Sequence, residues 1–224
     1  MNPSAPSRSG SKSTGLLILG TGIFAEEVTD LAEDCDQFEV VGYVENLDRT
    51  RCEQPLNGRP VYWVDQLAEL KADHQVICGL GTTLRSRFTA QADALGAKFA
   101  TLVHPLARVS RTTVLGEGTI VSVGSIIAAH SRLGRHVCVN RGALIGHHTE
   151  IGDFVTIGPG ANIAGKCRVG QATYVAMSAV VLDRITLGSQ CVIGAGSVVT
   201  KDQPDRVQVV GMPARVVKVK IDGR

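Results

Sequence analysis

Hydrophobic and polar positions follow one spacing up to about residue 103 and a different spacing beyond it. In the first part, short apolar runs alternate with helix-like stretches. Strands are expected at residues 16–19, 39–44, 75–79 and 98–102, and helices at 24–32, 65–72 and 83–95. Because strands separated by helices form βαβ units, this order predicts a parallel sheet with helices on its faces. We therefore expect an α/β domain over residues 15–103.

In the second part, every sixth residue from Val109 to Val199 is Val, Ile or Leu. A period of six fits neither an α-helix, with about 3.6 residues per turn, nor a flat strand, with about two. It is typical of a triangular solenoid in which three short strands make a coil of eighteen residues. Five glycines recur at that longer interval and are expected to stack at one corner: Gly116, Gly134, Gly152, Gly170 and Gly188. We expect a left-handed parallel β-helix over residues 104–224, an exception to the usual right-handed crossover.

The loop after the first strand carries the main binding signal of the α/β part. Gly20 and Gly22 follow a strand and open a helix, in the sequence GTGIFA. There the backbone can approach a ligand closely, and the helix N-terminus favours an anion such as a pyrophosphate. Glu45 ends the second strand, where it can accept hydrogen bonds from a ribose or a base. The pattern predicts a Rossmann-like nucleotide-binding domain, with a tight turn that binds nothing as the alternative, since Ala25 replaces the third glycine.

Composition narrows the class of protein. The 224 residues include 23 Lys and Arg against 21 Asp and Glu, so no basic footprint indicates a nucleic-acid partner. No apolar run approaches the roughly 18 residues that span a bilayer, so no membrane insertion is expected. Six scattered cysteines without a C-x-x-C pair suggest neither a zinc site nor a disulfide framework and fit a reducing cytoplasm. The Ser- and Pro-rich residues 1–14 are expected to be a disordered tail.

Apart from this tail, the chain resembles the bacterial nucleotide-sugar N-acetyltransferases and the related sugar O-acyltransferases. The enzymes that acetylate 4-amino sugars for bacillosamine and perosamine are the most similar type. The resemblance rests on ILGTGIFAEEV, VVGYVEN, GLGTTLRSR, LVHPLARVS, NRGALIGHHTEIGDFVTIGPGANIAG and VVTKDQPDRVQVVGMPARVV. It implies a Rossmann-like domain joined to a left-handed β-helix, with acetyl-CoA as co-substrate and no metal. It also implies a bacterial, cytoplasmic homotrimer with active sites between subunits.

His147 is the candidate catalytic base. It follows the inward-facing Ile145 by two residues, so its imidazole is expected to project outward from a corner. Gly165, eighteen residues later, leaves space and a free N–H beside the imidazole. Formation of an amide from a thioester needs both a base and donors for the oxyanion. The resemblance likewise implies that His147 is the base and Gly165 the glycine that contacts the thioester. The alternative is a histidine that is only solvated or packed in a trimer.

The residue after His147 departs from the family. Relatives carry Asp or Glu there, which stabilises the charged imidazole, whereas this chain has His148. His148 is expected to stack over His130, one coil earlier. We expect His148 to orient the base, with a structural or substrate contact as the alternative. Glu150, Asp153 or a neighbouring subunit are the other candidates for the missing charge.

The resemblance also implies the remaining contacts. Coenzyme A is expected at Thr156, Gly165, Met177, Ala195, Arg215 and Lys218, and the sugar nucleotide at Gly22, Ile23, Phe24, Glu45, Asn46 and Thr83. Thr156 and Phe24 stand where relatives have histidines, so this chain departs from the family pattern at one cofactor contact and at one nucleotide contact. A solvated basic tail is the alternative for Arg215 and Lys218. His104 with Pro105 is expected at the joint between domains rather than at a ligand.

Together these features predict an acetyl-CoA-dependent N-acetyltransferase that acts on a nucleotide-linked 4-amino sugar. A sugar O-acetyltransferase would use the same base on a hydroxyl, and the sequence barely separates the two. A third reading is a non-catalytic nucleotide sensor on a trimeric scaffold. A zinc enzyme of the γ-carbonic anhydrase type needs an H-x4-H spacing, which His130, His136, His147 and His148 do not provide.

Overall fold

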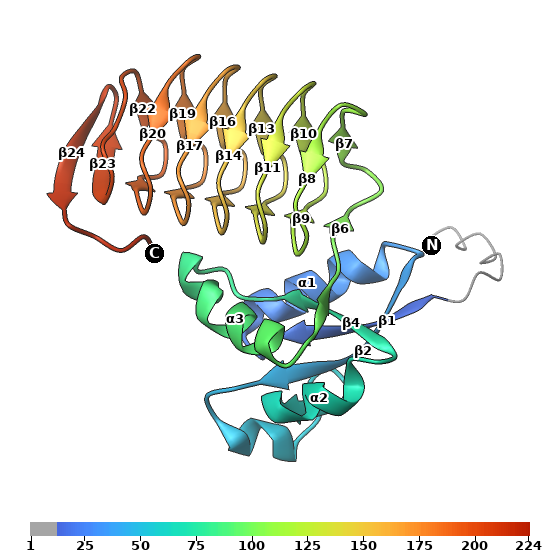
Figure 1. The fold of residues 1–224 in the computed structure, drawn as a ribbon. Coiled ribbons are helices and arrows are strands. Elements are labelled where there is room, and N and C mark those ends of the chain that lie inside the picture. Colours follow the sequence, from blue (N-terminus) through green and yellow to red (C-terminus); the bar gives the residue numbers. More distant parts are fainter. Residues whose placement is uncertain (1–12) are drawn as a thin grey trace, which may run out of the picture.

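The computed structural model describes residues 13–224, which form an α/β domain below a β-helix in the view of Figure 1. The α/β domain holds five parallel strands in the order β3-β2-β1-β4-β5, the order of a doubly wound sheet. They are β1 (Thr14–Leu19), β2 (Phe38–Glu45), β3 (Val61–Trp63), β4 (His74–Cys78) and β5 (Lys98–Phe99). The predicted parallel α/β layer is thus confirmed. Residues 1–12 of the predicted tail lie outside the described residues, and Thr14 already belongs to β1.

Helices cover both faces of this sheet. They are α1 (Ile23–Glu33), α2 (Leu67–Leu70) and α3 (Ser86–Ala94), with 3-10 turns η1 (Arg49–Glu53), η2 (Val64–Gln66) and η3 (Thr83–Arg85). Successive residues of a strand point to opposite faces. Leu16 and Ile18 therefore pack with α1, while Leu17 and Leu19 pack with α2 and α3. This alternation divides the domain into two apolar layers, one on each side of the sheet.

Several expected elements differ in detail. β3 and η1 were not predicted, because a three-residue edge strand and a single 3-10 turn leave no periodic pattern. The helix expected at 65–72 is only η2 followed by α2, and the one expected at 83–95 begins as η3. The strand expected at 98–102 is two strands: β5 pairs with β4, whereas β6 (Leu102–Val103) pairs with β9 of the β-helix. The chain therefore changes sheets within this segment.

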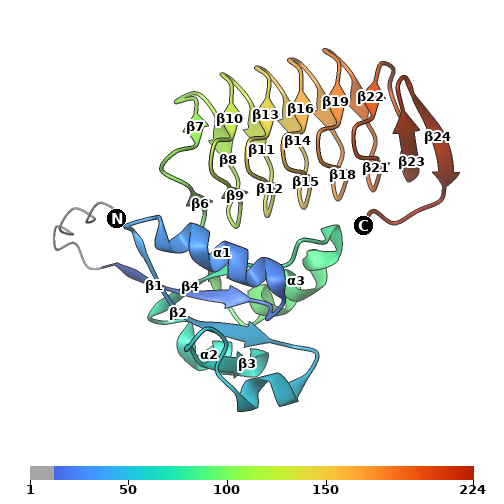
Figure 2. The same ribbon diagram turned by 180° about the vertical axis from the view of Figure 1, so that it is seen from behind.

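The β-helix consists of short strands that pair in parallel with strands eighteen residues away, so that three sheets enclose a prism (Figure 2). The sheet that faces the α/β domain, here the docked sheet, contains β6, β9 (Ile120–Val121), β12 (Cys138–Val139), β15 (Thr156–Ile157), β18 (Tyr174–Val175), β21 (Val192–Ile193), β23 (Val207–Gly211) and the antiparallel β24 (Ala214–Val219). These stacked parallel sheets fit the predicted left-handed β-helix.

The other two sheets are named by their outward side chains. The apolar sheet contains β7 (Arg108–Val109), β10 (Ile126–Ile127), β13 (Leu144–Ile145), β16 (Asn162–Ile163), β19 (Val180–Val181) and β22 (Val198–Val199). The charged sheet contains β8 (Val114–Leu115), β11 (Arg132–Leu133), β14 (Glu150–Ile151), β17 (Arg168–Val169) and β20 (Thr186–Leu187). The chain passes from the apolar sheet to the charged sheet and then to the docked sheet in each coil.

The six-residue repeat builds the core as predicted. The second residue of each strand from β7 to β22 is the repeating aliphatic, and Ile145, Ile157 and Ile163 are almost completely buried. The glycines also stack as predicted, because a Cβ on Gly116 would lie 2.4 Å from the carbonyl oxygen of Gly134. Only glycine allows coils to approach this closely at that corner.

Buried polar contacts of Arg85 and His104 help to fix the β-helix on the α/β domain. Arg85, which is 2% exposed, donates hydrogen bonds to the carbonyls of His136 (2.7 and 3.0 Å) and Val155 (2.9 Å). His104 accepts a hydrogen bond from Leu106 N–H at Nδ1, and its Nε2 lies 3.0 Å from a carboxylate oxygen of Asp34 at the end of α1. His104 therefore lies at the domain joint. Among residues 13–224, no helix is long and apolar enough to cross a membrane.

Candidate active site

His147 and His148 lie together at the corner where the chain passes from β13 to β14. We call the stacked residues 128–131, 146–149 and 164–167 the histidine corner. Both side chains are exposed, as predicted, and their Nδ1 atoms are 3.0 Å apart. The two rings meet edge to face, with centroids 5.2 Å apart. The local backbone explains this arrangement: His148 has a left-handed conformation (φ 57°), which turns its ring back toward its neighbour.

Gly165 lies beside the imidazole of His147, one coil further along the β-helix. A Cβ at Gly165 would stand 2.9 Å from Nε2 of His147 and 3.0 Å from Cε1. Any other residue at this position would therefore press on the imidazole. Within the described residues, the N–H of Gly165 donates no hydrogen bond. The predicted stacking of His147 and Gly165 is present, and it places a free donor and a potential base at one point.

Basic groups surround His148 along the corner. The rings of His130 and His148 have centroids 4.9 Å apart, so the predicted stacking is present, and Lys166 occupies the same position on the next coil. Loss of hydration, followed by the nearby His130, His147 and Lys166, lowers the pKa of His148. Glu150, a candidate for the missing acidic partner, forms an ion pair with Arg168 at 3.3 Å. Asp153 accepts a hydrogen bond from Arg135 N–H.

The predicted nucleotide site forms a pocket at the carboxyl end of β1 and β2. It encloses about 300 Å³, and Gly22, Glu45 and Asn46 line it. The carboxylate of Glu45 is already engaged, since it accepts hydrogen bonds from Thr21 Oγ1 and from the backbone N–H groups of Asn46 and Leu47. Burial opposes its charge, but these hydrogen bonds outweigh burial and lower the pKa of Glu45. Glu45 therefore shapes the loop more directly than it offers a free acceptor.

The other residues predicted for the nucleotide divide into two groups. Ile23, at the start of α1, is 87% exposed, and Phe24 follows it against Gly81. Thr83 lies elsewhere: it is buried in η3, and its hydroxyl and N–H contact the main chain of Arg224. The structure thus brings Gly22, Glu45 and Asn46 into one pocket and leaves Thr83 outside it.

The residues predicted for coenzyme A lie at several places. Met177 and Ala195 are exposed at the corner between the docked and apolar sheets, eighteen residues apart. Ala195 and Lys218 line one cavity of about 440 Å³ with Tyr174 and Arg224. Arg215 is exposed on β24, and its guanidinium contacts the Ala214 carbonyl. These residues and the histidine corner flank opposite edges of the apolar sheet, so a single chain does not bring them together.

Thr156, which was predicted to contact coenzyme A, is buried between the two domains. Its side chain is 2% exposed, and its Oγ1 accepts a hydrogen bond of 2.8 Å from Arg85. It lies on β15 in the docked sheet, which is the face opposite the histidine corner. Thr156 therefore belongs to the joint between the domains in this chain.

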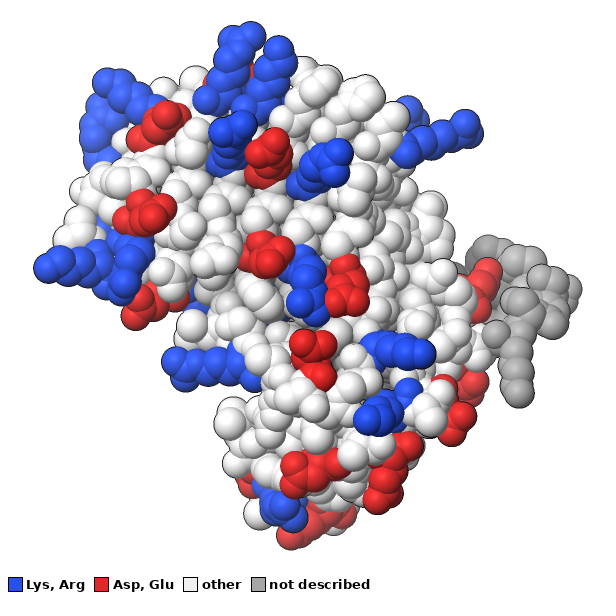
Figure 3. Space-filling model, viewed as in Figure 1, with Lys and Arg blue, Asp and Glu red and all other residues white. Residues whose placement is uncertain are grey.

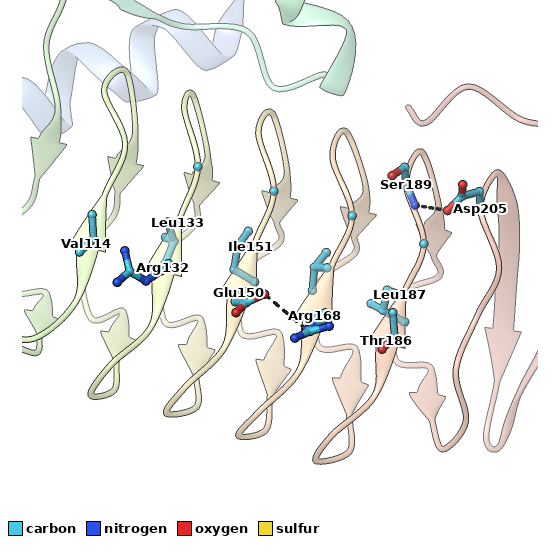
Figure 4. A pocket seen from close by; sticks show the side chains of 15 residues that line it. Val114, Arg132, Leu133, Glu150, Ile151, Arg168, Thr186, Leu187, Ser189 and Asp205 are labelled. Atoms are coloured by element: carbon cyan, nitrogen blue, oxygen red, sulfur yellow. Dashed lines mark hydrogen bonds and ion pairs between the residues drawn. The ribbon is translucent and has the colours of Figure 1, made fainter.

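A groove of about 610 Å³ runs along the outward face of the charged sheet (Figure 4). Arg132, Glu150 and Arg168 stand in a row along it, and a hydrogen bond from Ser189 N–H to Asp205 (2.8 Å) lies at one end. Figure 3 shows Lys and Arg side chains along the upper edge of the β-helix, whereas Asp and Glu gather over the lower part of the α/β domain. The near-neutral net charge thus conceals an uneven distribution.

Sequence reasoning missed two arginines. Arg51 lines the nucleotide pocket and donates hydrogen bonds to Thr21 at its Oγ1 (2.8 Å) and carbonyl (3.2 Å). Arg85 joins the domains. Arg51 belongs to no repeat or quoted motif, and Arg85 lies in the segment GLGTTLRSR without a signal of its own, so only the fold reveals their roles. In residues 13–224, no group of three or more His, Cys, Asp or Glu side chains is arranged to hold a metal ion.

Comparisons with known proteins show the family to which this chain belongs. No protein-family model matches the chain. The acetyltransferase domain of PglB from Neisseria gonorrhoeae FA1090, solved in complex with acetyl coenzyme A, is 30% identical with a TM-score of 0.82, and the match covers 92% of this chain and all of that one. The chain belongs to the β-helix sugar acetyltransferases. It is accordingly an acyltransferase.

Two further proteins are similar to this chain. PerB from Caulobacter crescentus, solved in complex with CoA and GDP-perosamine, is 29% identical with a TM-score of 0.84, covering 94% of this chain and all of that one. Galactoside O-acetyltransferase of Escherichia coli (strain K12) is 53% identical over only 34 residues, which are 15% of this chain and 17% of that enzyme. The matches to the solved structures extend over both domains, whereas the match to the galactoside enzyme is confined to a short segment.

Proposed function

We propose that the protein is an acetyl-CoA-dependent N-acetyltransferase that acetylates the amino group of a nucleotide-linked 4-amino sugar. The observation that carries this proposal is the likeness over both domains to PerB, an enzyme solved in complex with CoA and GDP-perosamine. The nucleotide pocket of about 300 Å³ at β1 and β2 supports the sugar-nucleotide class, and the histidine corner supports acyl transfer.

In the proposed reaction, the amine nitrogen of the sugar attacks the thioester carbonyl of acetyl-CoA in one ternary complex. His147 takes one proton from that nitrogen at Nε2, and the N–H of Gly165 donates to the oxyanion that develops. The C–S bond then breaks, so the products are the acetamido sugar and the free thiol of coenzyme A. No covalent acyl-enzyme is needed. The side of the imidazole that faces Gly165 is where both groups can meet one carbonyl.

The geometry of one chain supports an active site shared between subunits. The histidine corner joins the apolar and charged sheets, so it lies opposite the docked sheet on which the chain's own α/β domain sits. A sugar nucleotide held by that domain is therefore remote from His147 of the same copy. The apolar sheet beside the corner exposes Ile126 and Leu144, at 43% and 38%. We propose that a neighbouring copy covers this sheet in a homotrimer and brings its α/β domain to the corner.

The primary test is thiol release from acetyl-CoA with UDP-, GDP- and dTDP-linked 4-amino sugars, for the wild type and for His147→Ala. Turnover with one amino sugar, reduced about 100-fold or more by the substitution, would support both the class and the base. Asp183→Ala is the matched control, since Asp183 is exposed two coils further along the same corner. Turnover that His147→Ala leaves unchanged would refute the base. Nucleotide binding without any thiol release would instead favour the non-catalytic sensor.

Mixing two inactive variants tests the shared site. Nothing lies within 4 Å of a Cβ built at Gly22, so Gly22→Leu would fill the nucleotide pocket without disturbing the fold. If sites lie between copies, His147→Ala and Gly22→Leu chains should restore part of the activity when they assemble together. Activity that stays absent in such mixtures, with both variants folded and assembled, would place the whole site within one chain.

A sugar O-acetyltransferase is the second candidate. The observation that favours it is the 53% identity over 34 residues to galactoside O-acetyltransferase. The same panel should then contain nucleotide sugars with hydroxyl groups in place of the amine. Turnover of these acceptors, with none of the amino sugars accepted, would decide for oxygen.

A further inference from the structure

The two imidazoles of the histidine corner share one short contact. Nδ1 of His147 and Nδ1 of His148 lie 3.0 Å apart, which is a hydrogen-bond distance. A neutral imidazole carries a proton on only one of its nitrogens, so one ring must donate at this contact and the other must accept. The direction of the bond decides which nitrogen of His147 keeps a lone pair. If His147 donates from Nδ1, its Nε2 is a free base on the side of Gly165.

We propose that His148 is a positioning residue whose Nδ1 accepts the Nδ1–H of His147 and thereby keeps Nε2 of His147 unprotonated toward Gly165. This inference rests on the proposed function, because it assigns the residue that prepares the proposed base. In this role His148 provides a neutral acceptor at the position where relatives carry a carboxylate. A carboxylate and a neutral imidazole differ in charge, so they differ in their effect on the pH dependence of the reaction rate.

The surroundings of His148 favour its neutral form. His147 lies beside it, His130 stacks below it with ring centroids 4.9 Å apart, and Lys166 follows on the next coil. All three oppose a further positive charge, in agreement with the lowered pKa of His148. The nearby acidic groups are paired: Glu150 with Arg168 at 3.3 Å, and Asp183 with Arg184 at 3.0 Å. His148 thus remains available as an acceptor.

The bond strengthens during the reaction. When Nε2 of His147 takes the proton from the attacking amine, His147 becomes an imidazolium, and its Nδ1–H then donates as a charged group to neutral His148. Hydrogen bonds with a charged partner are stronger than neutral ones. An interaction that strengthens toward the transition state raises kcat rather than only the affinity. After the C–S bond breaks, the imidazolium of His147 gives this proton to the thiolate of coenzyme A.

The consequence is a distinctive pH dependence. A carboxylate beside the base would attract the proton and occupy Nε2 over a wider acidic range. A neutral imidazole at position 148 carries no charge that would attract this proton. His148→Asp should therefore move the acid limb of the kcat/KM profile to higher pH by about one unit.

The decisive measurement is ¹⁵N NMR of the imidazole nitrogens in the free wild-type enzyme, which shows where the proton resides. We expect the proton of His147 on Nδ1. Kinetics of three variants complete the test. His148→Gly suits the left-handed backbone and should lower kcat on the order of 10-fold with KM unchanged. His148→Asn retains an acceptor oxygen and should recover most of the rate. Arg184→Lys is the control at the same corner position, with φ 59°; it keeps a positive charge beside Asp183 and should leave rate and profile unchanged.

A proton found on Nε2 of His147 would overturn the inference, as would a His148→Gly enzyme with the wild-type rate. An acid limb that His148→Asp leaves in place would overturn the neutral-acceptor role. Each of these results leaves wild-type turnover intact, so the proposed function would stand. Absence of turnover in the wild type would remove the proposed function, while the NMR result would still report the direction of the bond.

Discussion

Two corners of the β-helix carry histidines that share a backbone conformation, but one histidine is buried and the other is exposed. His136, at the corner between the charged and docked sheets, and His148, at the histidine corner, both have left-handed conformations, with φ 55° and 57°. His136 is 3% exposed and packs between Phe99 and Phe154, with ring centroids 4.5 and 5.1 Å away. His148 is exposed beside His147. The repeat therefore sets the backbone of a corner, and the residues around it decide whether a histidine serves packing or chemistry.

The difference also appears in the hydrogen bonds. Among the described residues, Nδ1 of His136 is buried and has no hydrogen-bond partner. Burial first, followed by the nearby Arg135 and Arg85, lowers the pKa of His136 to about 4. This ring is kept neutral by its surroundings and makes no polar contact with a second imidazole. Changes at the buried corner should therefore alter stability, and changes at the histidine corner should alter activity at constant stability.

The largest effect is expected from Arg85, which holds the buried corner against the α/β domain. Arg85→Met retains the length of the side chain but leaves the carbonyl of His136 without a donor, and it removes one of the two donors to the carbonyl of Val155, which also accepts from Cys138 N–H. A buried group left unsatisfied costs about 1–3 kcal/mol, and the bonds lost at Val155 and Thr156 add to this cost, so the free energy of unfolding should fall by about 3 kcal/mol. Urea denaturation measures this change. The neighbouring exposed Arg87→Met is the control, expected within about 0.5 kcal/mol of the wild type. Equal stability of the two variants would show that Arg85 does not join the domains.

Gly165→Ala, at the histidine corner, should have the opposite effect to Arg85→Met: it should lower activity and leave stability unchanged. The new Cβ would stand 2.9 Å from Nε2 of His147, so the exposed imidazole must turn away from its working position. We expect kcat to fall by about 30- to 100-fold, since a displaced base loses most of its contribution. The midpoint of thermal unfolding should stay near that of the wild type, because the ring is free to move into solvent. Gly142→Asn is the control, because its Cβ would stand in open space and asparagine tolerates the left-handed backbone there (φ 66°). A loss of stability with full activity in Gly165→Ala would reverse the assignment of the two corners.

The sequence alone could predict the histidine corner because each coil repeats the same local constraints. The position of Ile145 in the repeat was enough to project His147 outward and to stack His148 over His130. The sequence could not predict the contact between the two Nδ1 atoms, because this contact depends on the rotation of the side chains and not on the register of the coils. Arg85 and Thr83 were missed or misplaced for a different reason. Their partners, His136 and Arg224, are distant in the sequence, and no repeat relates Arg85 or Thr83 to them, so only the tertiary fold brings them together.

The smallest effect concerns the pH dependence of stability at the buried corner. His136 has a pKa of about 4 in the folded chain against an ordinary value of 6.5. Between these values the unfolded chain binds more protons, so the free energy of unfolding should fall as the pH drops through this window. From pH 7 to pH 5 the contribution of His136 is about 1–2 kcal/mol.

His136→Phe removes this titration while keeping an aromatic ring beside Phe99 and Phe154. The backbone tolerates the change, since Phe154 itself has φ 59° at the same corner. Urea denaturation of both proteins at pH 7, 6 and 5 should give a flatter stability curve for the variant, by about 1–2 kcal/mol over the range. His148→Phe should flatten the slope less, because His148 is exposed, although its pKa is also lowered. If His136→Phe gave a curve parallel to the wild type, or if His148→Phe flattened it equally, burial would not be what separates the two corners.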